Sequence, residues 1–252
     1  MCRHLAYLGP AVALERLLSD PGHSLVRQSW QPRRQRFGTV NADGFGVGWY
    51  AEDDPVPARY RRAGPVWGDP GFADLTRVVR SGAFLAAVRD ATLPGADGEA
   101  AAAPFASGPW LFSHNGAVRG WPDAAGPLAA ALPPQDLLRL AARTDSALVW
   151  ALVLRRLREG EDMGTALAEP VRELSAAAPG SRLNLLLTDG AAIAATAWGD
   201  SLWYLADPAA GLVVVASEPH DDDARWYEVP DRTLLTATRT RVALTPLKET
   251  SP

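Results

Sequence analysis

The chain has 252 residues, a mass of 26.9 kDa and 47% hydrophobic residues, which is typical of a globular protein. Its formal net charge is -4 and its basic residues form only one short run, Arg33 to Arg36, so a nucleic-acid partner is not expected. The chain has a single lysine, Lys248, close to its end, which argues against P-loop chemistry. It has a single cysteine, Cys2, so an internal disulfide is excluded.

Neither a targeting signal nor a membrane segment stands out. The start lacks the basic, apolar and small-residue regions of a secretory signal, and no stretch approaches the about 18 uncharged apolar residues of a membrane span. We therefore expect a single domain over residues 1–252 in the cytoplasm, with residues 248–252 as a flexible tail and no membrane contact. We expect no cofactor and no metal, and the formation of a homo-oligomer is left open.

Hydrophobic patterns and turn residues outline an α+β protein. In chain order the expected elements are strand 2–8, helix 11–20, strand 45–52, helix 72–81, strands 84–89 and 110–115, helix 136–158, and strands 182–189, 192–198, 202–207, 212–218 and 241–247. Gly46 and Gly48 indicate close backbone approach within their strand, and residues 92–109 are expected to form a long surface loop. The short spacing of the later strands favours stacked antiparallel sheets over βαβ units.

Cys2 directly follows Met1, and its small side chain favours removal of that methionine. The mature chain would then carry a thiol and a free α-amine on one residue, and an α-amine with a pKa of about 7.7 to 8 can accept the thiol proton. The alternative is that Cys2 is a small buried hydrophobic residue at the start of a strand. A second alternative uses His4 as the base, because residues 2 and 4 of a strand share a face.

Three further motifs supply groups that acyl transfer requires. In FSHNG, the side-chain amide of Asn115 and the backbone N–H of Gly116 can converge on one oxygen, although Asn-Gly is also a common turn. Arg89 ends an apolar strand, where its planar guanidinium can hold a carboxylate. Asp145 begins a helix and either caps it or accepts from an ammonium group, and Thr144 can cap the helix instead.

These groups together describe a γ-glutamyl site. A nucleophile, an oxyanion hole, a carboxylate clamp and an ammonium clamp are what a γ-glutamyl group requires, because its α-carboxylate and α-ammonium must both be held. The sequence therefore predicts an enzyme that acts on a small γ-glutamyl molecule.

At these residues the chain resembles the class II glutamine amidotransferases, which are N-terminal-nucleophile hydrolases. The resemblance rests on Cys2, NADGFG at 41–46, R-x-x-T at 89–92, HNG at 114–116 and TDS at 144–146. It implies a four-layer α/β/β/α sandwich of two mainly antiparallel sheets. It also implies Cys2 as nucleophile and base, Asn115 and Gly116 as oxyanion hole, and a substrate-binding set of Arg89, Thr92, His114 and Asp145. Many members have a histidine after R-x-x-T, where this chain has Leu93.

Nearly the whole chain is similar to one branch of that family, the actinobacterial amidases of the ergothioneine pathway. The segments that carry this likeness include MCRHLAYLG, LNLLLTDG, WGDSL and VASEPHDDD. This branch removes glutamate from γ-glutamyl hercynylcysteine S-oxide, which contains a trimethylammonium group, and the tryptophans and the acidic run Asp221 to Asp223 are candidates to recognise it. Alternatives are another γ-glutamyl amine or dipeptide, glutamine itself, a subunit that supplies ammonia to a separate synthase, and a silent binding module.

Overall fold

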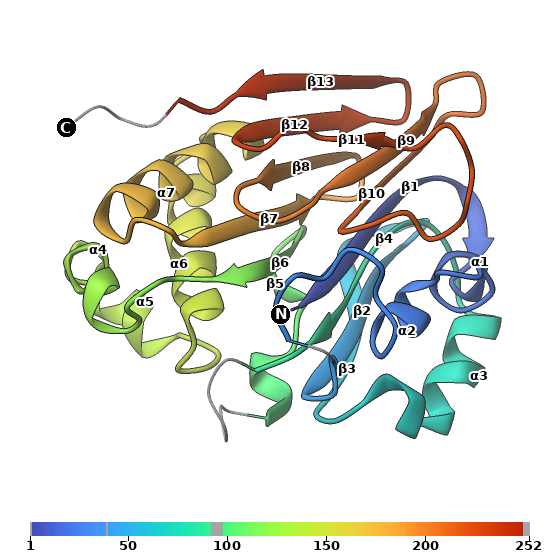
Figure 1. The fold of residues 1–252 in the computed structure, drawn as a ribbon, viewed down its shortest axis with the longest axis horizontal. Helices are drawn as coiled ribbons and strands as arrows, with labels where there is room; N and C mark the ends of the chain where they lie inside the picture. The colour runs from blue at the N-terminus through green and yellow to red at the C-terminus, as the bar shows by residue number, and fades with distance from the viewer. Residues whose placement is uncertain (1, 39, 92–97, 249–252) are drawn as a thin grey trace.

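Residues 2–38, 40–91 and 98–248 are described by a computed structural model. Thr92, and all of the expected tail except Lys248, lie outside these ranges. Within them the strands form two antiparallel sheets, one of seven strands in the order β11-β9-β10-β1-β4-β2-β3 and one of six in the order β13-β12-β8-β7-β6-β5 (Figure 1).

The bounds of the elements follow the chain. The first sheet contains β1 (Arg3–Ala13), β2 (Gly44–Ala51), β3 (Asp54–Arg62), β4 (Arg80–Arg89), β9 (Trp203–Asp207), β10 (Leu212–Ala216) and β11 (Tyr227–Glu228). The second contains β5 (Phe105–Ser107), β6 (Trp110–Ala117), β7 (Arg182–Thr188), β8 (Ala192–Ala197), β12 (Thr233–Thr238) and β13 (Arg241–Pro246). The helices are α1 (Glu15–Leu18), α2 (Leu25–Gln28), α3 (Pro70–Val78), α4 (Gly126–Ala130), α5 (Pro134–Leu138), α6 (Asp145–Arg158) and α7 (Met163–Ala177), with short 3-10 turns at Val66–Gly68, Gly98–Ala101 and Asp123–Ala125.

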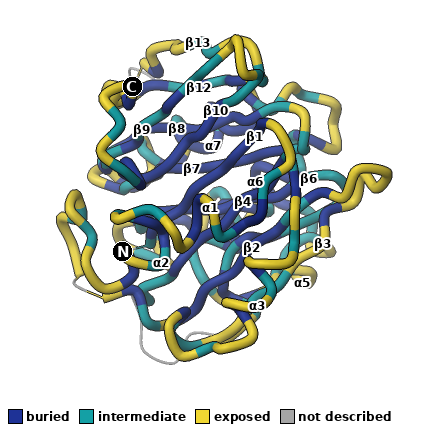
Figure 2. Tube along the Cα trace, turned by 90° about the vertical axis from the view of Figure 1, so that its right-hand side faces the viewer, coloured by how far each residue is buried: buried dark blue, intermediate teal, exposed yellow. Residues whose placement is uncertain are grey.

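Three apolar clusters hold four layers together. Helices α1 to α3 pack on the outer face of the first sheet, and α6 and α7 pack on the outer face of the second (Figure 1). The third cluster fills the space between the sheets, where the central strands are buried along most of their length (Figure 2). The expected α+β class and the four-layer α/β/β/α sandwich are confirmed.

Side-chain alternation along β1 decides which face each residue near the N-terminus occupies. Leu5 and Tyr7 point toward the helices on the outer face, whereas Ala6 and Leu8 point into the space between the sheets. His4 follows the even series and reaches Ser113 on β6 of the opposite sheet. The N-terminal end of β1 therefore lies against the second sheet.

Some predicted boundaries are wrong for identifiable reasons. Strand β1 continues through the expected turn at Gly9-Pro10, because Pro10 lies on a stretch where the register with β4 shifts and no ladder hydrogen bond is required of it. The expected helix 136–158 is two helices, α5 and α6, interrupted at residues 139–144. The expected loop 92–109 contains a 3-10 turn and strand β5 in its described part.

Other elements were absent from the predictions. Helix α7 carries Pro170 in its interior, a residue that normally ends a helix, and β3 and β12 are further omissions. The close approach expected at Gly46 is confirmed, because a Cβ there would lie 2.5 Å from the carbonyl oxygen of Ala103. No helix in the described ranges is long and apolar enough to cross a membrane.

Candidate active site

A cavity of about 310 Å³ lies between the end of β4 in the first sheet, the end of β6 in the second sheet and the start of α6. It is lined by Cys2 and by residues 89–91, 116–121 and 143–146, which include Arg89, Gly116 and Asp145. Strand β1 supplies the position of Cys2, β4 ends at Arg89, β6 brings Gly116, and α6 begins at Asp145. Four groups predicted from separate motifs thus surround one space.

Arg89 is held by the loop that precedes β2. Its Nη1 donates to the carbonyl oxygen of Asp43 at 3.3 Å, and the Asp43 carboxylate accepts from the backbone N–H of Ala91 at 2.7 Å. Within the described part of the chain Nε and Nη2 of Arg89 make no further hydrogen bond, so these donors are available to a carboxylate in the cavity. Asp43, in the NADGFG motif, was not predicted to have this supporting role.

Asp145 is the first residue of α6, and Thr144 is its N-cap. The Thr144 hydroxyl accepts from the backbone N–H of Ala147 at 3.3 Å, which leaves the Asp145 carboxylate free of the capping role. That carboxylate accepts from the backbone N–H groups of Val118 at 2.9 Å and Ser146 at 2.7 Å. Carboxylate oxygens have two acceptor positions each, so Asp145 can also accept from an ammonium group in the cavity.

Gly116 and Asn115 occupy consecutive positions of β6 with different exposure. A Cβ at Gly116 would overlap the carbonyl oxygen of Arg182, so glycine is required where β6 passes β7. Asn115 is fully buried and does not line the cavity; its Nδ2 donates to Ser217 Oγ at 3.4 Å and its Oδ1 has no hydrogen-bond partner. Exchanging the two amide atoms would place the NH2 donor at the unpartnered position.

His114 is buried and, like Asn115, does not line the cavity of about 310 Å³. Its Nδ1 is 3.0 Å from Ser146 Oγ, and its Nε2 donates to the carbonyl oxygen of Arg182 at 3.0 Å. Both ring nitrogens are thus used within the protein, and the ring borders a small space of about 20 Å³ behind Cys2. The arrangement suits a residue that fixes the start of α6 beside Cys2.

The environment of the thiol disfavours its spontaneous ionisation. Burial raises the pKa of Cys2, opposed in part by a backbone hydrogen bond from Asp90 and by the charge of Arg89. A thiol in this environment would require a base in order to act as a nucleophile. His4 is unsuited to that role, because burial, with smaller contributions from the charges of His114 and Arg3, lowers the pKa of His4 to about 3.

Ser217 and Glu218, in the VASEPHDDD segment, had no predicted role and shape the surroundings of the site. Glu218 is fully buried, and its two carboxylate oxygens accept from the backbone N–H groups of Arg33 at 2.9 Å and Arg34 at 2.7 Å, which fixes the loop after α2. No local pattern could reveal this contact, because the partners are far apart in the sequence. Ser217 also links strands, since its Oγ accepts from the backbone N–H of His4 at 3.0 Å.

The acidic run at residues 221–223 is engaged by neighbours within the protein. Asp221 accepts from Trp226 Nε1 at 2.7 Å, Asp222 pairs with Arg33 at 2.8 Å, and Asp223 pairs with Arg225 at 2.7 Å. These ion pairs and hydrogen bonds make the run a poor candidate for a trimethylammonium group. Trp121 is the tryptophan that lines the cavity. The described residues contain no group of three or more His, Cys, Asp or Glu side chains suited to a metal ion.

The sequence of the chain matches a known protein family and several named relatives. The family model described as "Glutamine amidotransferases class-II" matches residues 20–209. A γ-glutamyl-hercynylcysteine sulfoxide hydrolase of Mycobacterium tuberculosis is 42% identical over 247 residues, which are 98% of this chain and 97% of the relative. The enzyme of the same name from Mycolicibacterium smegmatis is 42% identical over 248 residues, covering 98% of this chain and all of the relative.

A solved structure agrees with the sequence relatives. The glutamine aminotransferase class-II domain protein from Silicibacter pomeroyi superposes with a TM-score of 0.71 at 26% identity, covering 98% of this chain and 99% of that one. The family model and the relatives both extend over most of the chain. The chain belongs to the class II glutamine amidotransferases.

Proposed function

We propose that this chain is an amidohydrolase that cleaves the γ-glutamyl amide bond of γ-glutamyl hercynylcysteine S-oxide and releases glutamate, a step of ergothioneine biosynthesis. The observation that carries the proposal is the arrangement of a thiol, an oxyanion donor, a guanidinium and a carboxylate around one cavity. The hydrolase class and the γ-glutamyl substrate accord with the names of relatives that are 42% identical over 98% of this chain.

The cavity orients the glutamyl group by its two charges. The Arg89 guanidinium holds the α-carboxylate, and the Asp145 carboxylate holds the α-ammonium. Because both charged groups are attached to the α-carbon, holding them fixes that end of the glutamyl group and directs the γ-carbonyl at its other end toward Cys2. Thr92 is proposed to assist Arg89, and His114 to hold Ser146 and the start of α6 in place.

Removal of Met1 frees the α-amine of Cys2, which takes the thiol proton as sulfur attacks the γ-carbonyl carbon. The carbonyl oxygen becomes an oxyanion that accepts from the N–H of Gly116 and, with the two amide atoms of Asn115 exchanged, from the NH2 group of that side chain. The carbon–nitrogen bond then breaks, and the departing amine takes the proton from the α-ammonium of Cys2. The α-amine of Cys2 then deprotonates a water molecule, which attacks the thioester carbon. This step releases glutamate and restores the thiol.

The alternative substrates share this chemistry and differ in the group that leaves, whereas a binding module would lack the chemistry altogether. Glutamine would release ammonia, and a γ-glutamyl dipeptide would release an amino acid. A binding module without turnover would release nothing, and a subunit that depends on a partner would release little glutamate alone.

The experiment is a parallel assay of glutamate release by the mature protein with γ-glutamyl hercynylcysteine S-oxide, glutamine and γ-glutamyl dipeptides. We expect the highest kcat/KM for the S-oxide and no turnover by Cys2→Ala. A higher kcat/KM for glutamine would reject the substrate assignment, whereas robust glutamate release by Cys2→Ala would reject the mechanism itself. Intact mass of the same preparation shows whether Met1 has been removed.

A further inference from the structure

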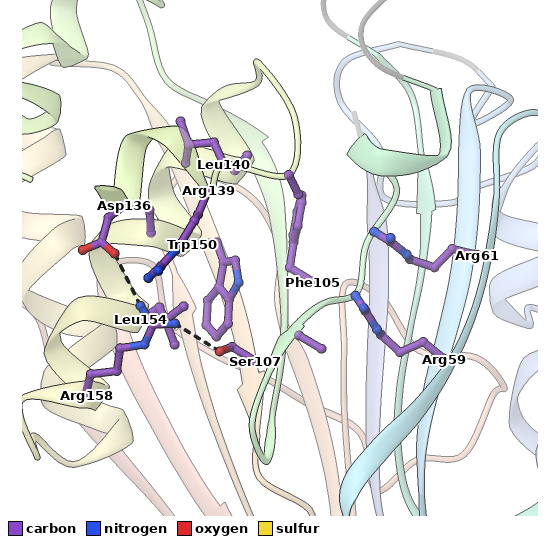
Figure 3. A pocket seen from close by; sticks show the side chains of 14 residues that line it. Arg59, Arg61, Phe105, Ser107, Asp136, Arg139, Leu140, Trp150, Leu154 and Arg158 are labelled. Atoms are coloured by element: carbon purple, nitrogen blue, oxygen red, sulfur yellow. Dashed lines mark hydrogen bonds and ion pairs between the residues drawn. The ribbon is translucent and has the colours of Figure 1, made fainter. Parts of the chain in front are cut away.

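The active-site cavity touches α6 at Asp145 and Ser146, whereas a second cavity, of about 230 Å³, is lined by residues of α6 from Ala147 to Arg158 (Figure 3). It is bounded by β3, β5, the segment between α5 and α6, and the face of α6 that carries Ala147, Trp150, Ala151, Leu154 and Arg158. Phe105 belongs to its wall and also borders the small space behind Cys2. We call this cavity the arginine pocket, after Arg59, Arg61, Arg139 and Arg158.

The charge around the arginine pocket is strongly unbalanced. Its four guanidinium groups face it from two sides, with Arg59 and Arg61 on β3 opposite Arg139 and Arg158 (Figure 3). Asp136 is the one carboxylate among its lining residues. Four positive charges against one negative charge leave a surplus that an anion in the cavity would neutralise.

The hydrogen bonds of the arginines leave donors available. Arg59 donates to the carbonyl oxygen of Pro104 at 3.2 Å, and Arg61 donates to that of Ala102 at 2.9 Å. Arg158 is shared between Asp136 at 3.5 Å and Ser107 Oγ at 3.4 Å, both at the long limit for a hydrogen bond (Figure 3).

The Arg139 guanidinium makes no hydrogen bond or ion pair within the described ranges, although it lies beside Asp136 and Trp150 (Figure 3). Each of the four arginines can therefore still donate to an anion. The like charges also act on one another, since burial and then the charge of Arg61 lower the pKa of Arg59.

The floor of the arginine pocket is apolar and rigid. Trp150 is 7% exposed and stacks on Phe112 with ring centroids 5.0 Å apart and planes at 16°. Phe105 and Leu154 extend this surface on either side. A ligand with an aromatic or aliphatic body would cover these side chains while its charged groups meet the guanidinium groups.

We propose that the arginine pocket binds a small organic dianion, whose carboxylate or phosphate groups are held by Arg139 and Arg158 on one side and by Arg59 on the other. The apolar body of the ligand rests on Trp150. The cavity is smaller than the about 300–1,000 Å³ typical of sites for drug-sized ligands, which indicates a ligand of metabolite size. This site is separate from the γ-glutamyl cavity, and the proposal does not depend on the proposed function.

The test is isothermal titration calorimetry of the full chain with phenyl phosphate and inorganic phosphate at an ionic strength of about 0.15 M. We expect saturable binding of phenyl phosphate, tighter than that of inorganic phosphate. Arg139→Ala and Arg158→Gln should each weaken binding by about tenfold or more, because each removes a charge-assisted hydrogen bond. Arg139 is exposed, so its replacement does not threaten the fold.

Two control variants locate the binding. Arg155 is an arginine of the same helix, α6, but it pairs with Glu159 and lies outside the arginine pocket. Arg155→Ala should therefore leave binding unchanged. Arg89→Ala removes the guanidinium of the active site and should also leave binding unchanged. Absence of saturable binding, equal loss in Arg155→Ala and Arg139→Ala, or loss in Arg89→Ala would each overturn the proposal. None of these outcomes bears on glutamate release.

Discussion

Replacing Arg89 with lysine tests the carboxylate clamp. Arg89 ends β4, and Asp43 holds its Nη1 at 3.3 Å, so the guanidinium is oriented before a substrate arrives. Lysine keeps the positive charge but cannot donate from two nitrogens in one plane. Losing one hydrogen bond between charged groups costs about 1.5–3 kcal/mol, which corresponds to a decrease of about 10- to 150-fold in kcat/KM.

The assay is glutamate release at low substrate concentration, combined with thermal unfolding to show that the variant is folded. Arg77→Lys is the matched control, because Arg77 is an exposed arginine of α3 paired with Asp74 on the same helix. The control should retain the wild-type kcat/KM. A decrease of less than about threefold in Arg89→Lys would refute the assignment of Arg89 to the α-carboxylate.

Three further predictions concern His4, Gly116 and Asp145. Because burial holds the His4 pKa at about 3, below the usual 6.5, unfolding free energy should fall by up to about 1.4 kcal/mol per pH unit as pH drops between these values. In His4→Gln, urea titrations at several pH values should show a weaker dependence of the unfolding free energy on pH. Loss of a general base lowers kcat/KM by about 100-fold or more, and His4→Gln should lower it by less than that. Gly116→Ala should lower the free energy of unfolding by about 1–3 kcal/mol, because its Cβ overlaps the Arg182 carbonyl; unchanged denaturation would contradict this. Asp145→Asn should raise KM for the γ-glutamyl substrate, and an unchanged KM would remove Asp145 from ammonium binding.

Local patterns were sufficient to predict the elements that position the site. The apolar run before Arg89 gave β4, and Thr144 caps α6 in the manner that the TDS sequence allows. These features depend on alternation and capping, which act over a few residues. The expected strand end at Asn115 was wrong, because HNG lies inside β6, which continues to Ala117. The four lining groups could therefore be chosen before their distances were known.

Contacts between distant segments could not be predicted. The hydrogen bond between Asn115 and Ser217 connects the two sheets. The hydrogen bonds of Glu218 with Arg33 and Arg34, in the loop after α2, connect residues that are 185 and 184 positions apart in the sequence. Helix α7 was missed because Pro170 interrupts its pattern, although its apolar face packs on the second sheet and outweighs the lost hydrogen bond. Such packing becomes visible only once the sheets are assembled.

The arginine pocket shows the same limit for a binding surface. Its arginines come from β3, from the segment after α5 and from the end of α6, and β3 is far in the sequence from the other two. Composition revealed a slightly acidic chain, which gave no indication of a locally basic cavity. Charge has to be counted around a cavity, not along the chain, to identify such a site.

The central claim is that Cys2 acts as nucleophile only after its α-amine is free. The most direct test is mass spectrometry of the protein after reaction with an electrophilic glutamine analogue, followed by peptide mapping of chains with and without Met1. The account predicts one covalent adduct on the Cys2 sulfur, formed in chains that lack Met1 and much more slowly in chains that retain it. An adduct at another residue, or equal reaction rates in both forms, would contradict it.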